Sequence, residues 1–435
     1  MRTPIRTITS LCFAAGLLAA QPVDDTKLKQ AIVFGRHSVR APVAPDSYLN
    51  TYSVRPYPVF RVAAGILTDN GTKLSEILGG YYRLWLQKEG LLTGNDAADA
   101  PFVYLHANSL QRTRATAQAF ATGLLPGATL SVEWQQQGSD PLFDPVGAGV
   151  ARLDSRRAIA AVQGRVGGNA QSLASAYAPE LALARALLLN YPVGQTTPPA
   201  APAGAIDVTS LPFTITAGTL GMPVTLGGFG DVVNTVDPFL MQYAEGMPVS
   251  DVGWGQLTAG GVNQIARLYG VSIDLMFRTP YLAGVQSSNM ASHITRSLIQ
   301  SATGSTMTGA LGSPSIKAVV LIGSDVQILS LAGLFHLDWM TPGYPPDFAS
   351  PGGGLVFELR QSQSTGEHIV RASYITQTLD QLRNRTALTL ASPPARVPIF
   401  IPGCSTRNAT FDCALEDFVS MANRSIESGA VDRKN

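Results

Sequence analysis

A short apolar run, Ala31–Phe34, breaks at Gly35 and is followed within five residues by Arg36, His37 and Arg40. Apolar runs of this length that end in glycine are typical of a central strand at the point where the chain turns. In open α/β sheets, ligands bind in the crevice beyond such strand ends. Two guanidinium groups can clamp a phosphate through forked hydrogen bonds, and an imidazole between them is a candidate nucleophile. Taken alone, the stretch is explained equally well as a surface turn with ordinary basic residues.

Two later segments have the same organisation. The run Ala318–Ile322 is expected to be a strand buried on both faces, and Ser324 and Asp325 follow it at the start of a helix. The strand expected over Phe102–His106 leads to a helix over Arg112–Leu124 that opens with two arginines. Cations at a helix N-terminus need a nearby anion, either a bound phosphate or a carboxylate elsewhere in the fold. We expect the three strand ends to converge on one crevice.

These segments resemble the signatures of one enzyme family. The sequences RHSVRAP (36–42), QRTRAT (111–116) and GSDVQ (323–327) are similar to the R-H-G-x-R-x-P, R-T-R-x-T and G-H-D-T-N segments of the histidine acid phosphatases. The stretches DPLFDP (140–145) and PGGGLVFEL (351–359) extend the resemblance to the phytase and glucose-1-phosphatase group of branch 2 of the histidine phosphatase superfamily. The resemblance implies an α/β fold with a mostly parallel sheet, helices on both faces and an inserted, mainly helical cap.

The expected domain organisation follows from changes of pattern along the chain. Residues 1–20 carry two arginines and then an apolar run ending in small residues, which is typical of a secretory signal peptide. The α/β domain is expected to occupy 21–154 and 271–435. The cap is expected over 155–270, with helices at 155–166, 170–189 and 228–244 and strand-like alternation at 208–226.

The resemblance implies a role for each matched residue. His37 would attack phosphorus to form a phosphohistidine, and Asp325 would donate a proton to the leaving oxygen. The phosphate group would be bound by Arg36, Arg40, Arg112 and Ser324. The surrounding pocket would include Asn108, Asp237, Arg278 and Val326. A solvated or helix-capping acid is an equally good interpretation of Asp237.

The chain departs from the family pattern at Ser324, where the family usually has a second histidine. Loss of one preorganised donor typically costs about 3–4 kcal/mol of transition-state stabilisation. The expected function is therefore an acid phosphomonoesterase, with a catalytically impaired phosphate or phosphosugar binder as the alternative. Asn108, Val326 and the absence of a lysine at Val43 and Ala44 favour sugar phosphates or a broad substrate range over phytate.

Cysteine content and composition add to this prediction. Outside the signal peptide the chain has two cysteines, Cys404 and Cys413, and an even number in an exported protein predicts a disulfide. Hydrophobic residues make up 45% of the chain, the net charge is +1, and five histidines show no metal-ligand spacing. We therefore expect a periplasmic or secreted hydrolase that acts on a small phosphomonoester without a cofactor or metal, and that binds neither nucleic acid nor membrane.

Overall fold

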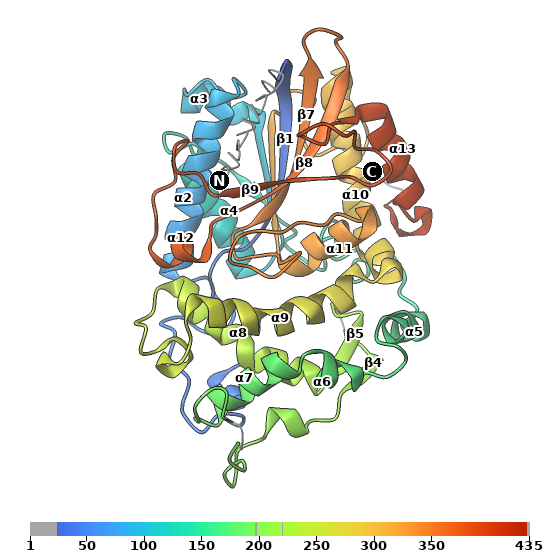
Figure 1. The fold of residues 1–435 in the computed structure, drawn as a ribbon. Helices are drawn as coiled ribbons and strands as arrows, with labels where there is room; N and C mark the ends of the chain where they lie inside the picture. The colour runs from blue at the N-terminus through green and yellow to red at the C-terminus, as the bar shows by residue number, and fades with distance from the viewer. Residues whose placement is uncertain (1–23, 196–197, 220, 433–435) are drawn as a thin grey trace, which may run out of the picture.

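The computed structural model describes residues 24–195, 198–219 and 221–432 (Figure 1). The predicted signal peptide, residues 1–20, lies outside this range. In the described residues, eight strands form one sheet in the order β10-β8-β7-β1-β6-β2-β3, with β9 paired to β8. The α/β fold with a central sheet expected from the sequence is confirmed.

The sheet is mixed, and β1 lies at the junction of its two halves. The parallel half contains β1 (Thr26–Arg36), β6 (Ala318–Gly323), β2 (Val103–Ala107) and β3 (Val132–Glu133). The antiparallel half adds β7 (Gly354–Ser362), β8 (His368–Thr376), β9 (Ala395–Ile399) and β10 (Cys413–Ala414). The parallel half is the one that carries the signature segments at its carboxyl ends.

Helices cover both faces of the sheet. Alternate residues of β1 therefore point into two separate hydrophobic cores. Ile32 and Phe34 belong to the core shared with α10 (Pro280–Thr303), α11 (Asp325–Phe335) and α13 (Leu415–Ser425). Ala31 and Val33 belong to the core shared with α2 (Asp69–Lys88) and α4 (Gln111–Leu124). The near-continuous apolar runs of the central strands reflect this burial on two sides.

Helices α2 and α4 pack against each other through glycine. A Cβ atom on Gly79 would lie 2.1 Å from the carbonyl oxygen of Phe120, and one on Gly123 would lie 2.0 Å from that of Glu76. Because no side chain separates the two backbones, the helices form a tight pair along one face of the sheet. The pair supports the loop that follows β1.

Residues 155–270 form most of a second layer beneath the sheet in Figure 1. Its elements are α5 (Ser155–Arg165), α6 (Ser172–Ala176), α7 (Ala178–Leu188), β4 (Thr214–Ala217), β5 (Val224–Gly227), α8 (Phe229–Glu245) and α9 (Ala259–Ile273). The helix expected over 170–189 is split in two at Tyr177, and the strand-like stretch contains a two-stranded hairpin. We propose that this segment is the inserted cap.

Shorter elements complete the fold. They are α1 (Asp46–Leu49), α3 (Asp96–Asp99), α12 (Leu379–Arg383), a π-helical turn at Asp274–Arg278, and 3₁₀ turns at Ala100–Phe102, Val208–Ser210, Val252–Gly255 and Ser428–Ala430. The predicted disulfide between Cys404 and Cys413 is present. No helix within the described ranges has the length and apolar character needed to cross a bilayer.

Candidate active site

The signature segments meet because their strands end in register. Arg36 at the end of β1 pairs with Gly323 at the end of β6, and the next amide, that of His37, donates to the Gly323 carbonyl at 2.9 Å. On the other side of β6, the amide of Asn108 after β2 donates to the carbonyl of Ile322 at 2.9 Å. The loop after β1 and the N-termini of α4 and α11 therefore lie at one edge of the sheet, as the sequence predicts.

His37 is held as a neutral imidazole with one defined tautomer. Its side chain is buried, and its Nδ1 lies 2.8 Å from the carbonyl oxygen of Ser38. A carbonyl oxygen only accepts hydrogen bonds, so Nδ1 carries the proton and Nε2 keeps its lone pair. Burial, followed by the charges of Arg36, Arg40 and Arg112, holds the pKa of His37 well below 6.5. The lowered pKa favours the neutral ring, in which Nε2 keeps a lone pair.

Three arginines around His37 have unused donors. The Nε–H groups of Arg36, Arg40 and Arg112 are buried and have no hydrogen-bond partner among the described residues. Burial, followed by the like charge of Arg40, also lowers the pKa of Arg112. Buried N–H groups without partners are costly, and adjacent guanidinium groups repel one another. An anion that accepts from all three would remove both penalties.

The same arginines are fixed by other contacts. Arg36 Nη1 donates to the carbonyl of Ala349 at 2.7 Å, and Arg36 Nη2 pairs with Asp325 Oδ2 at 2.8 Å. Arg40 pairs with both carboxylate oxygens of Asp237, at 2.9 and 3.5 Å. Arg112 Nη1 donates to the carbonyl of Gly65 at 3.3 Å. Asp237, which the sequence places in the pocket, thus lies there as the partner of Arg40.

The N-terminus of α11 brings Asp325 and Ser324 to the site. Asp325 is the first residue of the helix, and its Oδ1 accepts from the amide of Val326 at 3.0 Å. The hydroxyl of Ser324 donates to Gln327 Oε1 at 2.9 Å, and the Ser324 amide donates to the same oxygen at 2.8 Å. The serine that replaces the usual histidine is therefore engaged in a helix cap and brings no charge to the pocket.

Tyr269 on α9 is a functional candidate that sequence reasoning missed. Its hydroxyl donates to Asp325 Oδ2 at 2.6 Å and also lies 3.5 Å from Arg36 Nη2. Burial, followed by the charge of Asp325, raises the pKa of Tyr269, so the hydroxyl stays protonated and remains a donor. In the sequence Tyr269 is one aromatic residue of an amphipathic helix, and no local signal separates it from residues of the core.

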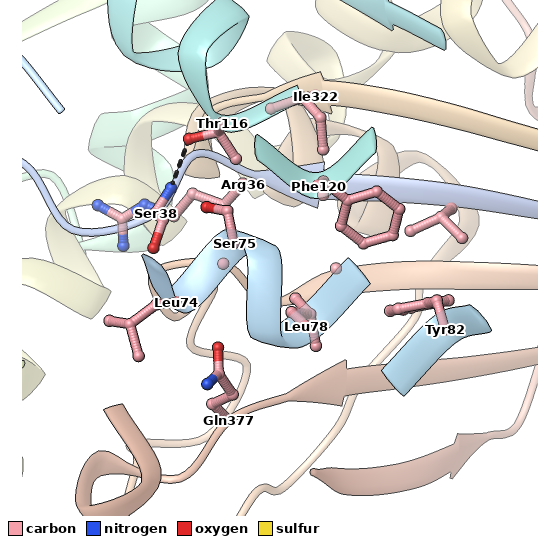
Figure 2. A pocket seen from close by; sticks show the side chains of 14 residues that line it. Arg36, Ser38, Leu74, Ser75, Leu78, Tyr82, Thr116, Phe120, Ile322 and Gln377 are labelled. Atoms are coloured by element: carbon pink, nitrogen blue, oxygen red, sulfur yellow. Dashed lines mark hydrogen bonds between the residues drawn. The ribbon is translucent and has the colours of Figure 1, made fainter. Parts of the chain in front are cut away.

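The loop after β1 and the N-termini of α4 and α11 border a cavity of about 560 Å³. Its lining includes seven of the predicted site residues, namely His37, Arg40, Arg112, Asp237, Ser324, Asp325 and Val326, whereas the buried Arg36 lines a different and much smaller cavity. Behind the signature loop lies a second, far smaller cavity of about 10 Å³, between α2 and α4 (Figure 2). Figure 2 shows Ser38 on its wall, with its amide donating to Thr116 Oγ1 at 3.1 Å. A space this small holds one water at most, so of these two cavities only the larger one can admit a substrate.

Two residues that the sequence assigns to the pocket lie outside the large cavity. Asn108 lines a neighbouring cavity of about 410 Å³, which shares Val326 with the large one. Arg278 requires a correction, because its guanidinium pairs with Asp338 at 2.5 Å and Asp347 at 2.6 Å. These carboxylates hold Arg278 at the base of α10, where it ties the π-helical turn to the loop after α11.

The positive charge at the site comes from arginine. Among the described residues we find no group of three or more His, Cys, Asp or Glu side chains arranged to hold a metal ion. The N-terminus of α11 adds the positive end of a helix dipole beside Asp325. The arrangement can bind a dianion against a neutral imidazole, with a carboxyl group beside it.

Known proteins share this arrangement of segments. The model of the histidine phosphatase superfamily (branch 2) matches residues 21–172. The chain is 31% identical to phytase AppA of Escherichia coli (strain K12) over 411 residues, 93% of this chain and 93% of that protein. It is 29% identical to glucose-1-phosphatase of Salmonella typhimurium over 403 residues, 91% of this chain and 92% of that protein.

Solved structures agree with the sequence relatives. The Hafnia alvei phytase in complex with tartrate matches with a TM-score of 0.84 and 31% identity, over 94% of this chain and 99% of that chain. The same phytase in complex with myo-inositol hexakis sulphate matches with a TM-score of 0.81 at the same identity and coverage. From its signature, its fold and these relatives, the chain belongs to branch 2 of the histidine phosphatase superfamily.

Proposed function

We propose that the protein is an exported acid phosphomonoesterase that acts through a phosphohistidine on small organic phosphates. The observation that supports this most directly is the neutral Nε2 of His37 among three arginines whose Nε–H groups are free to donate. A nucleophile and an anion clamp are thereby preorganised in one buried place. Such preorganisation is the largest contribution to catalysis in most enzymes.

In the first step, the phosphate oxygens accept from Arg36, Arg40 and Arg112 while Nε2 of His37 attacks phosphorus. The Nε2–P bond forms as the bond from phosphorus to the ester oxygen breaks, and Asp325 gives its proton to the departing oxygen. Without substrate, Asp325 pairs with Arg36 at 2.8 Å. The second phosphate ionisation lies near pH 6, so in acid the substrate brings a proton that can pass to Asp325 as the phosphate takes over Arg36.

In the second step, water attacks the phosphohistidine. The carboxylate of Asp325 accepts the proton of the attacking water, the Nε2–P bond breaks, and inorganic phosphate leaves. Tyr269 donates to the carboxylate oxygen that also pairs with Arg36, and so fixes the carboxyl group in both steps. In this proposal Tyr269 is a positioning residue, because it acts through Asp325.

We propose sugar phosphates or a broad range of phosphomonoesters as substrates, with phytate less favoured. Arg40 and Arg112 are the two permanently charged cations that line the cavity in the described residues, and no lysine is among them. A ligand with six phosphate groups would need more positive charge than this. Export is supported by the signal-like segment at residues 1–20.

A catalytically impaired phosphate binder is the second candidate, because the Ser324 hydroxyl is already bonded to Gln327. Phosphate release from p-nitrophenyl phosphate, measured from acidic to neutral pH, separates the two. We expect release that is highest in acid and is lost in His37→Ala. Folded protein that binds inorganic phosphate in a calorimeter but releases none from the ester would instead support the binder.

A further inference from the structure

The lining of the large cavity contains a group of apolar side chains beside its charged and polar residues. Val43, Leu110 and Met222 all line it, and their side chains are 56%, 41% and 37% exposed. Exposed apolar side chains gathered at one place usually mark a binding surface. Behind them the lining continues with the buried side chains of Val224, Leu226, Val233, Ile273 and Met276.

The apolar side chains come from the same segments as the phosphate-binding residues. Val43 follows Arg40 by three positions, and Leu110 precedes Arg112 by two. Val326 directly follows Asp325, the residue that protonates the ester oxygen in the proposed mechanism. The apolar side chains are therefore close in sequence to the residues that would bind the phosphate group and protonate the ester oxygen.

Charge in the cavity does not favour a second anionic group. Two arginines line the described wall together with three aspartates, Asp231, Asp237 and Asp325. Asp237 is paired with Arg40, and Asp231 accepts from the hydroxyl of Tyr48 at 2.6 Å. Once the arginines hold one phosphate group, the described residues that line the cavity include no further arginine or lysine to bind another.

The cavity also continues past the apolar side chains. Leu110, Met222 and Val326 line both the 560 Å³ cavity and the neighbouring one of about 410 Å³. These three residues form an apolar ridge between the two spaces, and Gly221 and Gln327 border both spaces as well. An alcohol with several carbon atoms could lie across this ridge while its phosphate remains at His37.

We propose that, within the broad range of phosphomonoesters, the preferred substrates are esters of apolar alcohols rather than sugar phosphates, with an arylalkyl or alkyl group on the ester oxygen. The proposal rests on the proposed function, because it takes the phosphate group to bind at His37. Burial of the apolar group against the ridge supplies the preference, since transfer of apolar surface out of water is favourable. The substrate is thus recognised by one phosphate group and one hydrophobic group.

The test compares benzyl phosphate with glycerol 3-phosphate and phytate. Benzyl phosphate and glycerol 3-phosphate both release an alkoxide, so their intrinsic reactivity is similar and kcat/KM reports recognition. We expect kcat/KM to be at least about tenfold higher for benzyl phosphate. Met222→Gln should lower the ratio of the kcat/KM for benzyl phosphate to that for glycerol 3-phosphate about fivefold. Met340→Gln is the matched control, because Met340 is 75% exposed and lines none of the cavities described above.

A binding measurement keeps the inference separate from turnover. Titration calorimetry with benzylphosphonate and methylphosphonate needs no hydrolysis, and we expect at least about tenfold tighter binding of benzylphosphonate. If no ester is hydrolysed but this difference is found, the proposed activity fails and the apolar preference stands. Equal affinities, or a kcat/KM for phytate or glycerol 3-phosphate that matches benzyl phosphate, would overturn the inference.

Discussion

Acidification should destabilise the folded protein through His37. Burial and the charges of Arg36, Arg40 and Arg112 hold the pKa of His37 well below its ordinary value of 6.5. Below pH 6.5 the unfolded chain therefore binds a proton at this residue that the folded chain does not. By linkage, stability falls by about 1.4 kcal/mol for each pH unit, until the pH reaches the pKa of the folded state. Above pH 6.5 the imidazole is neutral in both states and contributes nothing.

Urea unfolding of the wild type and His37→Asn at a series of pH values measures this effect. His293 and His368 also have lowered pKa values through burial. Both residues are present in the wild type and in the variant, so their contributions to the difference in unfolding free energy cancel. Below about pH 6.5 the wild type should lose stability more steeply than the variant, by up to about 1.4 kcal/mol for each pH unit. Parallel curves would refute the reasoning, because His37 would then take up a proton as easily in the folded protein as in the unfolded chain.

Three further substitutions test other parts of the structure. Tyr269→Phe removes a donor 2.6 Å from Asp325, so kcat/KM for benzyl phosphate, which reports the first step, should fall at least about tenfold, and less for p-nitrophenyl phosphate, whose leaving group needs little protonation. An equal loss on both esters would exclude action through Asp325. Ser324→His should raise kcat/KM about tenfold by adding a donor to the pocket, whereas Ser324→Ala should change it little. A kcat/KM for Ser324→His no higher than that of Ser324→Ala would contradict this expectation. Cys404→Ser should lower the free energy of unfolding by about 2–3 kcal/mol in urea, since the disulfide to Cys413 closes a loop with a sequence separation of 9. An unchanged unfolding midpoint would show that the disulfide constrains little.

The central part of the fold could be predicted because burial on both faces leaves a strong pattern. The strands Thr26–Arg36 and Ala318–Gly323 contain the apolar runs Ala31–Phe34 and Ala318–Ile322, and each run leads directly into residues that match a family segment. Parallel pairing then brings His37 and Asp325 to one edge without further information. The convergence of the three signature segments is a consequence of strand register, so it follows from the sequence.

Contacts between distant segments could not be predicted in this way. Tyr269 reaches Asp325 across a sequence separation of 56 residues, and its helix reads as an ordinary amphipathic helix. Arg278 was misplaced for the same reason, since the carboxylates that hold it, Asp338 and Asp347, come from a loop about 60 residues later. The apolar cavity wall likewise depends on how the hairpin of β4 and β5 lies against the signature, which no single segment encodes.

The covalent intermediate is the most direct test of the proposed chemistry. Asp325→Asn, mixed with p-nitrophenyl phosphate, should still form the phosphohistidine, because this leaving group departs without a proton, but should hydrolyse it slowly. After an alkaline quench, intact mass and peptide mapping should show one phosphoryl group on His37, and none when His37→Ala is added. A phosphoryl group on another residue, or release of phosphate without any phosphorylated protein, would contradict the assignment of His37 as the nucleophile.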